Sequence, residues 1–173
     1  MIKQLFCVFP LLAGSLTAAP DFSIDEAGLR VGLDAENGES FTSVEAIVYF
    51  DSPWEWEVGE RLEIELETEA SLGILDGNGT TAGLVHFGFA AFFELDDFPL
   101  RFVLSTGPTL LSEDEFDDFD IGGHFQFTSA AGLDWEVMDE WSLGYRYQHI
   151  SNAGLEGTNP GLNLHVLALS YDF

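Results

Sequence analysis

Apolar and polar residues alternate along most of this chain, and this alternation constrains the fold more than any other feature. The clearest case is RLEIELETEASLGIL, residues 61–75. One parity there is apolar: Leu62, Ile64, Leu66, Ala70, Leu72 and Ile74. The other parity is charged or polar: Arg61, Glu63, Glu65, Glu67, Glu69 and Ser71. A period of two residues places the two sets on opposite faces of a β-strand.

The rest of the chain repeats this pattern and has no convincing helical period after residue 19. Seven more segments are predicted to be strands: 27–35, 42–50, 82–94, 100–110, 124–135, 141–151 and 162–173. Eight strands result, most of them about long enough to cross a bilayer at a tilt. The chain ends at Phe173, and a terminal aromatic residue on a last strand is typical of outer-membrane barrel proteins.

The connections between these segments also alternate. Those near 51–60, 96–99 and 136–140 are predicted to be mostly tight turns. Those near 36–41, 74–81, 111–123 and 152–161 are mostly longer or richer in Gly and acidic residues. This alternation favours an all-β fold, an eight-stranded antiparallel transmembrane β-barrel of the outer-membrane type with both chain ends in the periplasm.

The position of the aromatic residues decides which face of this barrel is outside. A soluble barrel would turn its apolar face inward, and alternation alone permits that arrangement. Here Phe87 and Phe89 share one face, as do Phe125, Phe127 and Trp135. Tyrosines and the C-terminal Phe are placed like the interfacial girdle of a membrane barrel: Tyr145, Tyr147, Tyr171 and Phe173. We therefore expect the apolar face to contact lipid.

The opposite parity collects the charged residues. It includes Glu45, Glu63, Glu65, Glu67, Glu69, His86, Glu94, Gln126, Asp134 and Gln148, together with Arg30, Arg61, Arg101 and Arg146. A basic residue facing lipid at mid-depth costs about 2–4 kcal/mol, so these groups are predicted to face inward and pair. Eight strands leave an interior that side chains fill. An ion network in the core is therefore favoured over ion transport.

The first nineteen residues, MIKQLFCVFPLLAGSLTAA, have the pattern of an export signal. Lys3 gives a positive start, an apolar run follows, and small residues end the segment at Ala19. We expect a signal peptide over residues 1–19 and a barrel domain over residues 20–173. The single cysteine, Cys7, lies within the signal, so no disulfide is expected after cleavage.

The charge balance excludes one class of partner. The chain has 31 acidic and 5 basic residues, a formal net charge of −26, whereas a nucleic-acid-binding protein needs a basic face. The acidic segment SEDEFDDFD, residues 112–120, lacks the spacing of an EF-hand loop and is interpreted as a solvated, mobile loop. Neither His86 nor His124 has a companion at metal-ligand spacing, and we expect no metal site and no cofactor.

The stretch QHISNAGLEGTNPGLNLH, residues 148–165, carries the candidate chemistry. If Arg146 and Gln148 face inward, then His149 and Ser151 face lipid, about 6.6 Å apart along the strand. Counting back from the C-terminus places Asn163 and His165 outward as well, with Asn163 roughly opposite His149. A His beside a Ser suits nucleophilic acyl transfer, in which the imidazole removes the hydroxyl proton.

The segments YRYQHISNAGL and NPGLNLH resemble the C-terminal signature of the lipid A 3-O-deacylase (PagL) family. The close match covers residues 145–173, which would form a catalytic hairpin. The resemblance implies an eight-stranded outer-membrane barrel that hydrolyses the 3-position ester of lipid A with a lipid-facing Ser–His–Glu triad. It implies that Ser151 is the nucleophile and His149 the general base.

The resemblance also assigns the residues of the connecting loop. Asn159 matches an asparagine that would stabilise the oxyanion together with the backbone N–H of Gly154. Asn152 completes the motif, either as part of the chemistry or simply to hold the loop.

One position departs from the family pattern. The acidic member of the triad falls on Asn163, and an amide can orient an imidazole without stabilising its positive charge. In a Ser–His–Asp enzyme the change from acid to amide costs about ten-thousand-fold in turnover. Three interpretations stay open: a weaker Ser–His dyad, a carboxylate supplied by Glu156, or a site that has lost catalysis.

These observations predict an exported outer-membrane hydrolase whose partners are lipid A in lipopolysaccharide and the surrounding lipids. The expected products are a deacylated lipid A and a 3-hydroxy fatty acid. Two alternatives are an esterase or phospholipase acting on other outer-leaflet lipids, and a non-enzymatic structural or adhesion barrel with a decayed site.

Overall fold

The computed structural model of this chain describes residues 23–35, 41–96 and 98–173. The expected signal peptide lies outside these ranges. The strands within them are β1 (Ile24–Asp34), β2 (Thr42–Phe50), β3 (Glu55–Val58), β4 (Leu62–Gly77), β5 (Thr80–Leu95), β6 (Leu100–Leu111), β7 (Glu115–Phe116), β8 (Phe119–Asp120), β9 (Phe125–Met138), β10 (Trp141–Ser151) and β11 (Leu162–Asp172). Within these ranges, no helix is long and apolar enough to cross a membrane.

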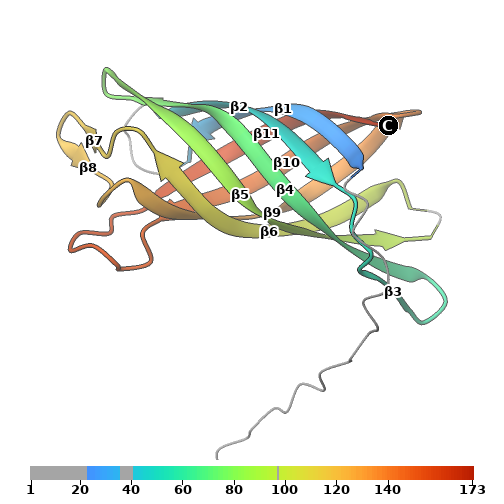
Figure 1. Cartoon of the computed structure of the whole chain (residues 1–173). Helices are drawn as coiled ribbons and strands as arrows, with labels where there is room; N and C mark the ends of the chain where they lie inside the picture. The colour runs from blue at the N-terminus through green and yellow to red at the C-terminus, as the bar shows by residue number, and fades with distance from the viewer. Residues whose placement is uncertain (1–22, 36–40, 97) are drawn as a thin grey trace, which may run out of the picture.

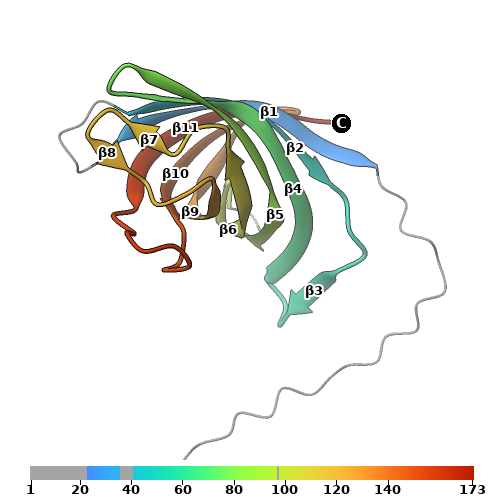
Figure 2. The same ribbon diagram turned by 60° about the vertical axis from the view of Figure 1, so that its left-hand side comes forward.

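Eight of these strands form one closed antiparallel barrel (Figures 1 and 2). Their order is β2-β1-β11-β10-β9-β6-β5-β4, and pairing of β2 with β4 closes the ring. The predicted fold is therefore confirmed. The bounds predicted for β2 and β10, 42–50 and 141–151, agree with the observed ones, and the other six strands differ only at their ends.

The two ends of the barrel differ in their connections. We call one end the loop end, because it carries the connections 78–79, 112–124 and 152–161. We call the other the terminal end, because β1 begins there and β11 ends there. Figure 1 shows β7 and β8 at the loop end, opposite the C-terminus and β3.

The expectation that residues 51–60 form mostly tight turns is wrong. Glu55–Val58 is strand β3, which extends the ladder of β4 beyond its pairing with β2. Trp56 lies opposite Ile64 in this hairpin. The alternation Trp-Glu-Trp-Glu-Val, residues 54–58, accounts for the strand, and the neighbouring Pro53 had marked the segment as a turn.

The predicted parity holds along the barrel strands. Phe87 and Trp135 face outward with more than half of their surface exposed, 54% and 53%. Inward side chains such as Glu45, Gln126 and Arg146 are almost fully buried. One placement is wrong: Arg61 lies exposed in the turn between β3 and β4, outside the barrel wall.

Ion pairs fill the interior. Arg146 makes a two-pronged contact with Asp134, with Nη1–Oδ1 at 2.5 Å and Nη2–Oδ2 at 2.8 Å. Glu69 lies between Arg30, at 3.3 Å, and the His86 ring, at 3.0 Å. Pairing of this kind offsets the cost of burying each charge, which accounts for the inward parity.

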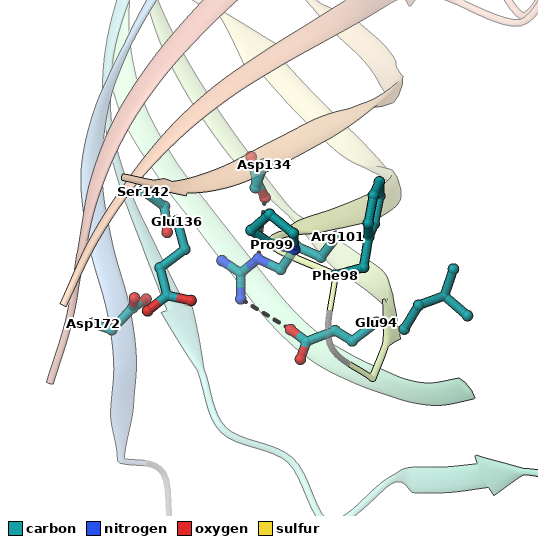
Figure 3. Close-up of a pocket in the computed structure, with 9 residues that line it drawn as sticks. Glu94, Phe98, Pro99, Arg101, Asp134, Glu136, Ser142 and Asp172 are labelled. Atoms are coloured by element: carbon teal, nitrogen blue, oxygen red, sulfur yellow. Dashed lines mark ion pairs between the residues drawn. The ribbon is translucent and has the colours of Figure 1, made fainter. Parts of the chain in front are cut away.

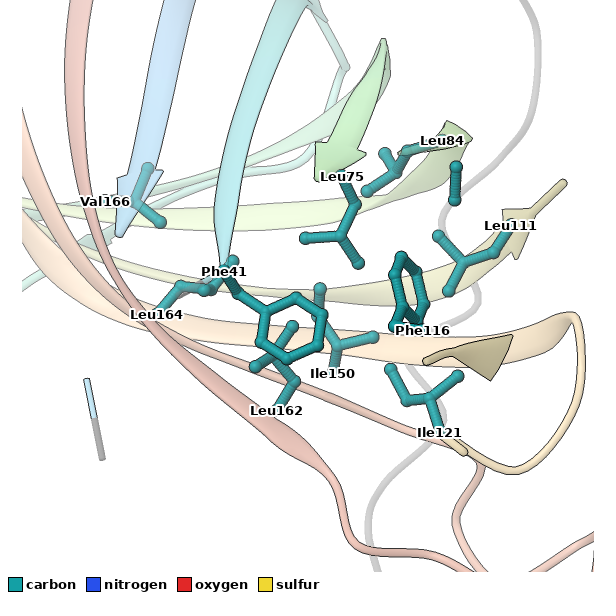
Figure 4. Close-up of a cluster of buried hydrophobic side chains, with 11 residues drawn as sticks. Phe41, Leu75, Leu84, Leu111, Phe116, Ile121, Ile150, Leu162, Leu164 and Val166 are labelled. Atoms are coloured by element: carbon teal, nitrogen blue, oxygen red, sulfur yellow. The ribbon is translucent and has the colours of Figure 1, made fainter. Parts of the chain in front are cut away.

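An apolar cluster closes the loop end of the barrel (Figure 4). Its buried members are Phe41, Leu75, Ala82, Leu84, Leu111, Phe116, Ile121, Ile150, Leu162, Leu164 and Val166. Phe116 belongs to the short hairpin β7–β8, and its ring lies 5.2 Å from that of Phe41. The acidic segment 112–120 is thus not simply a solvated loop, because Phe116 anchors it inside the barrel end.

Candidate functional site

The candidate site lies on the outer face of the hairpin formed by β10 and β11. Ile150 and Leu162 point inward into the apolar cluster and are fully buried. Their neighbours His149, Ser151 and Asn163 have the opposite parity and face outward. Because packed inward residues and a full strand ladder hold both strands, the outward side chains start from a rigid backbone.

His149 and Asn163 lie directly opposite each other in the ladder, as predicted. The His149 Nδ1 and Asn163 Oδ1 atoms are 2.7 Å apart, which is a short hydrogen bond. A carbonyl oxygen only accepts, so Nδ1 carries the proton and Nε2 has its lone pair available. An imidazole in this tautomer can take a proton at Nε2.

Gly161 gives the His149 ring its space, and the sequence did not single it out. Its φ of +68° is in the left-handed region that favours glycine. A Cβ at this position would lie 2.8 Å from His149 Cε1 and 3.5 Å from Nε2. The only local signal is the turn sequence Asn159-Pro160-Gly161.

Ser151 ends β10 on the same outer face as His149 and is half-buried. In the described ranges, the hydrogen bonds of the site include none between Ser151 Oγ and the His149 ring. Two residues on one strand face are about 6.6 Å apart at their backbones, so the His149 ring has to lean toward Ser151 for the two side chains to meet. Catalytic contacts of this kind often tighten only when substrate binds.

Asn152 organises the loop that follows Ser151. It is fully buried, and the two hydrogens of its Nδ2 are shared among three carbonyl oxygens: Gly122 at 2.7 Å, Thr158 at 2.8 Å and Glu156 at 2.9 Å. Its Oδ1 accepts from the Gly154 N–H at 2.7 Å. These contacts fit the holding role that was one of the two alternatives for this residue.

The two candidate oxyanion donors, Asn159 and Gly154, differ in whether their N–H groups already have an acceptor. The Asn152 backbone N–H donates to Asn159 Oδ1 at 3.2 Å, which orients the amide of Asn159 and leaves its Nδ2 as the donor end. The Gly154 N–H already donates to Asn152. Gly154 could therefore serve an oxyanion only by sharing this hydrogen or by turning.

Glu156 extends toward a neighbouring loop. A Cβ added to Gly123 would overlap the Glu156 carboxylate, which therefore lies against that glycine. Asn163, not Glu156, is the residue whose hydrogen bond with the His149 ring is seen in this structure.

Further polar pairs lie beside the site on the outer face. Ser129 of β9 is opposite His149 in the ladder, and its Oγ lies 2.9 Å from Thr106 Oγ1 of β6. His165 Nδ1 lies 2.7 Å from the Tyr145 hydroxyl, and the two rings stack. Polar groups on this surface thus pair with one another, which reduces the cost of facing lipid.

A cavity lies elsewhere, at the terminal end of the barrel (Figure 3). Its volume is about 290 Å³, and its lining residues are Glu94, Leu95, Phe98, Pro99, Arg101, Asp134, Glu136, Ser142 and Asp172. Arg101 contacts Glu94 at 3.7 Å and Asp134 at 3.4 Å. This cavity belongs to the interior ion network and is far from His149.

One group of carboxylates in the described ranges is close enough together to hold a metal ion: Glu55, Glu63 and Glu65. It lies on the β3–β4 hairpin at the terminal end, so it is also remote from His149 and Ser151.

Comparison with known proteins covers both the barrel and the hairpin. A family model described as lipid A 3-O-deacylase (PagL) matches residues 42–172. The protein named Lipid A deacylase PagL of Bordetella bronchiseptica is 28% identical over 176 residues, which span 99% of this chain and 96% of that protein. A crystal structure of the outer membrane enzyme PagL superposes with a TM-score of 0.73 at 18% identity, over 86% of this chain and 99% of the other. The superposition supports the barrel fold independently of the sequence match.

Proposed function

This chain belongs to the lipid A 3-O-deacylase (PagL) family, and we propose that Ser151 and His149 on the outer face of the barrel carry out its reaction. The protein is an ester hydrolase of the outer membrane, and lipid A is its substrate. The observation that supports the site most strongly is the hydrogen bond of 2.7 Å between His149 and Asn163 on a surface that faces lipid.

The proposed reaction has two stages. Ser151 Oγ attacks the carbonyl carbon of the 3-position ester while His149 Nε2 takes the hydroxyl proton. The tetrahedral intermediate collapses, the sugar oxygen leaves, and His149 returns the proton to it. Water then attacks the acyl-serine with His149 as base, which releases the fatty acid and restores Ser151.

Asn163 orients the base in this scheme. Its carbonyl oxygen holds the Nδ1–H of His149, which keeps Nε2 directed as a proton acceptor. It adds no charge to stabilise the imidazolium. We therefore propose a Ser–His dyad with an amide orienter, slower than a site with a carboxylate at position 163.

Asn159 is the proposed oxyanion donor. Its Oδ1 is held by the Asn152 N–H, so its Nδ2 can point toward the charge that develops on the ester carbonyl oxygen. Gly154 contributes a second donor if its N–H is shared with Asn152. One such donor is typically worth 10²–10³-fold in turnover.

The position of the site suits a membrane lipid. Farther along the outer face of the same hairpin, toward the terminal end, lie apolar residues such as Leu167 and Leu143, which are 63% and 48% exposed. An acyl chain of the substrate would lie along this surface beside the barrel while its ester reaches Ser151 near the loop end. No passage of the substrate through the filled interior is needed.

The test is mass spectrometry of lipid A from cells that express the protein, the Ser151→Ala variant or the Ser105→Ala variant. Ser105 is a matched control because this serine of β6 is buried and its side chain faces the barrel interior, away from the site. Wild type and Ser105→Ala are expected to remove one 3-hydroxyacyl group, and Ser151→Ala none, with all three barrels folded. Normal deacylation by Ser151→Ala would refute the assigned nucleophile, and unchanged lipid A with folded wild type would favour another outer-leaflet lipid or a decayed site.

A further inference from the structure

The loop 152–161, which we call the catalytic loop, rests against a turn from a different part of the barrel. This turn, Gly122–Gly123, follows β8 and precedes β9. Both glycines have left-handed backbones, with φ of +86° and +94°. We call the pair the glycine seat.

The contact between seat and loop is close enough to exclude any side chain. A Cβ on Gly122 would overlap the Thr158 carbonyl oxygen and the Asn152 amide nitrogen, and a Cβ on Gly123 would overlap the Glu156 carboxylate. The Gly122 carbonyl accepts a hydrogen bond of 2.7 Å from Asn152 Nδ2. The other two acceptors of that amide, Glu156 and Thr158, belong to the catalytic loop itself.

The seat is in turn held by its own surroundings. Asp120 Oδ1 accepts from the Gly122 N–H at 2.8 Å. Gln126 Nε2 donates to the Gly123 carbonyl at 2.5 Å and to that of Gly122 at 3.4 Å, and Gln126 is fully buried. Ile121, beside the seat in sequence, packs in the apolar cluster at the loop end (Figure 4). The seat therefore has a fixed position relative to β9.

We propose that the glycine seat is a positioning element for the oxyanion donor of this enzyme. The Gly122 carbonyl holds the side chain of Asn152, and the backbone N–H of Asn152 holds Asn159 Oδ1. This chain of two contacts sets where the Asn159 amide lies relative to Ser151. The inference rests on the proposed function, in which Asn159 stabilises the oxyanion. A displacement of a reacting group by about 1 Å costs about 100-fold in rate, so a small shift of the seat has a measurable effect.

The experiment compares Gly122→Ala with Gly79→Ala. Gly79 has nearly the same φ, +85° against +86°, but a Cβ there meets nothing within 4 Å. Both substitutions place a side chain at the same unfavourable φ, and only Gly122→Ala pushes on the catalytic loop. We expect kcat to fall about 100-fold in Gly122→Ala with KM changed only a few-fold, and Gly79→Ala to stay near wild type. Equal activity of the two variants would overturn the proposal.

Asp120 supplies a second, milder test should the Gly122→Ala barrel fail to fold. Asp120 is exposed. The Asp120→Ala variant removes the acceptor of the Gly122 N–H and also the weaker contact of 3.4 Å that Thr158 Oγ1 of the catalytic loop makes with Asp120 Oδ2. We expect a loss of about three- to tenfold in kcat. Asp120→Asn keeps an acceptor oxygen at the same position and is expected to restore the wild-type rate. Wild-type kcat in Asp120→Ala would also count against the seat.

A double variant separates positioning from a general structural effect. In an Asn159→Ala background the donor is already absent, so adding Gly122→Ala is expected to cost only a few-fold more. If kcat of the double variant instead falls by the product of the two single-variant losses, the seat does not act through Asn159. Rates are measured on lipid A and on a p-nitrophenyl acyl ester in detergent. If the wild-type protein hydrolyses the p-nitrophenyl ester but not lipid A, the proposed function is contradicted. The rates of the variants on the p-nitrophenyl ester then still test the glycine seat.

Discussion

Replacing Asn163 by Asp tests whether the site lacks only a charge. The two side chains have the same shape, so the oxygen that lies 2.7 Å from His149 Nδ1 stays in place and becomes part of a carboxylate. In the proposed reaction His149 gains a positive charge in each transition state. The negative charge at position 163 would then stabilise the transition state more than the ground state, and kcat is expected to rise.

The size of this gain follows from the geometry of the pair. Two unit charges about 4 Å apart attract by about 4 kcal/mol at an effective dielectric constant of 20. Since about 1.36 kcal/mol corresponds to tenfold in rate, the upper limit is roughly a thousandfold. We expect an increase in kcat of between about ten- and a thousandfold, below the ten-thousand-fold effect known for a buried Ser–His–Asp site.

The assay is release of fatty acid from lipid A by the purified barrel in detergent, with kcat and KM determined separately. Asn163→Leu, which has a similar size and no acceptor, is expected to be slower than wild type. Asn163→Glu restores the residue type implied by the family, and its longer side chain is expected to give a smaller gain because the His149 ring has to shift. A wild-type rate in Asn163→Asp, with Ser151→Ala inactive, would refute the idea that His149 becomes charged in the rate-limiting step.

Two further substitutions test the donor and the interior. Asn159→Ala should lower kcat by about 10²–10³-fold with little change in KM, as measured by fatty-acid release, and a change in KM alone would contradict its role in the transition state. Arg146→Leu should lower barrel stability by at most about 3–5 kcal/mol, because Asp134 loses its two-pronged partner and keeps only the contact of 3.4 Å with Arg101. The temperature at which the barrel loses its folded mobility in SDS gels measures this loss, and the exposed Arg61→Ala should leave it unchanged.

The barrel could be predicted because alternation is a local property of each strand. Residues such as Leu62 and Glu63 reveal their faces without knowledge of any partner strand. The short strands β3 and β7–β8 could not be found in this way. Four or two residues carry too little periodicity, and Phe116 becomes buried only because the barrel end beneath it is apolar.

In the candidate site, too, the strand residues could be predicted and the loop contacts could not. Parity places His149, Ser151 and Asn163 on one face, and the register of the hairpin brings His149 opposite Asn163. The loop contacts could not be predicted, because Gly122 and Asn152 are distant in sequence and no period relates two loops. The engagement of the Gly154 N–H by Asn152 is a fact of loop geometry that a motif does not contain.

The amide at position 163 also has a physical advantage on this surface. A carboxylate facing lipid is costly whenever no imidazolium balances it, and His149 is neutral between turnovers in the proposed scheme. Asn163 forms the same hydrogen bond to His149 without that cost. Asn163→Asp is therefore expected to gain turnover and lose barrel stability together. A variant that gained turnover with unchanged stability would show that position 163 is reached by water from the loop end and that its surroundings do not disfavour charge.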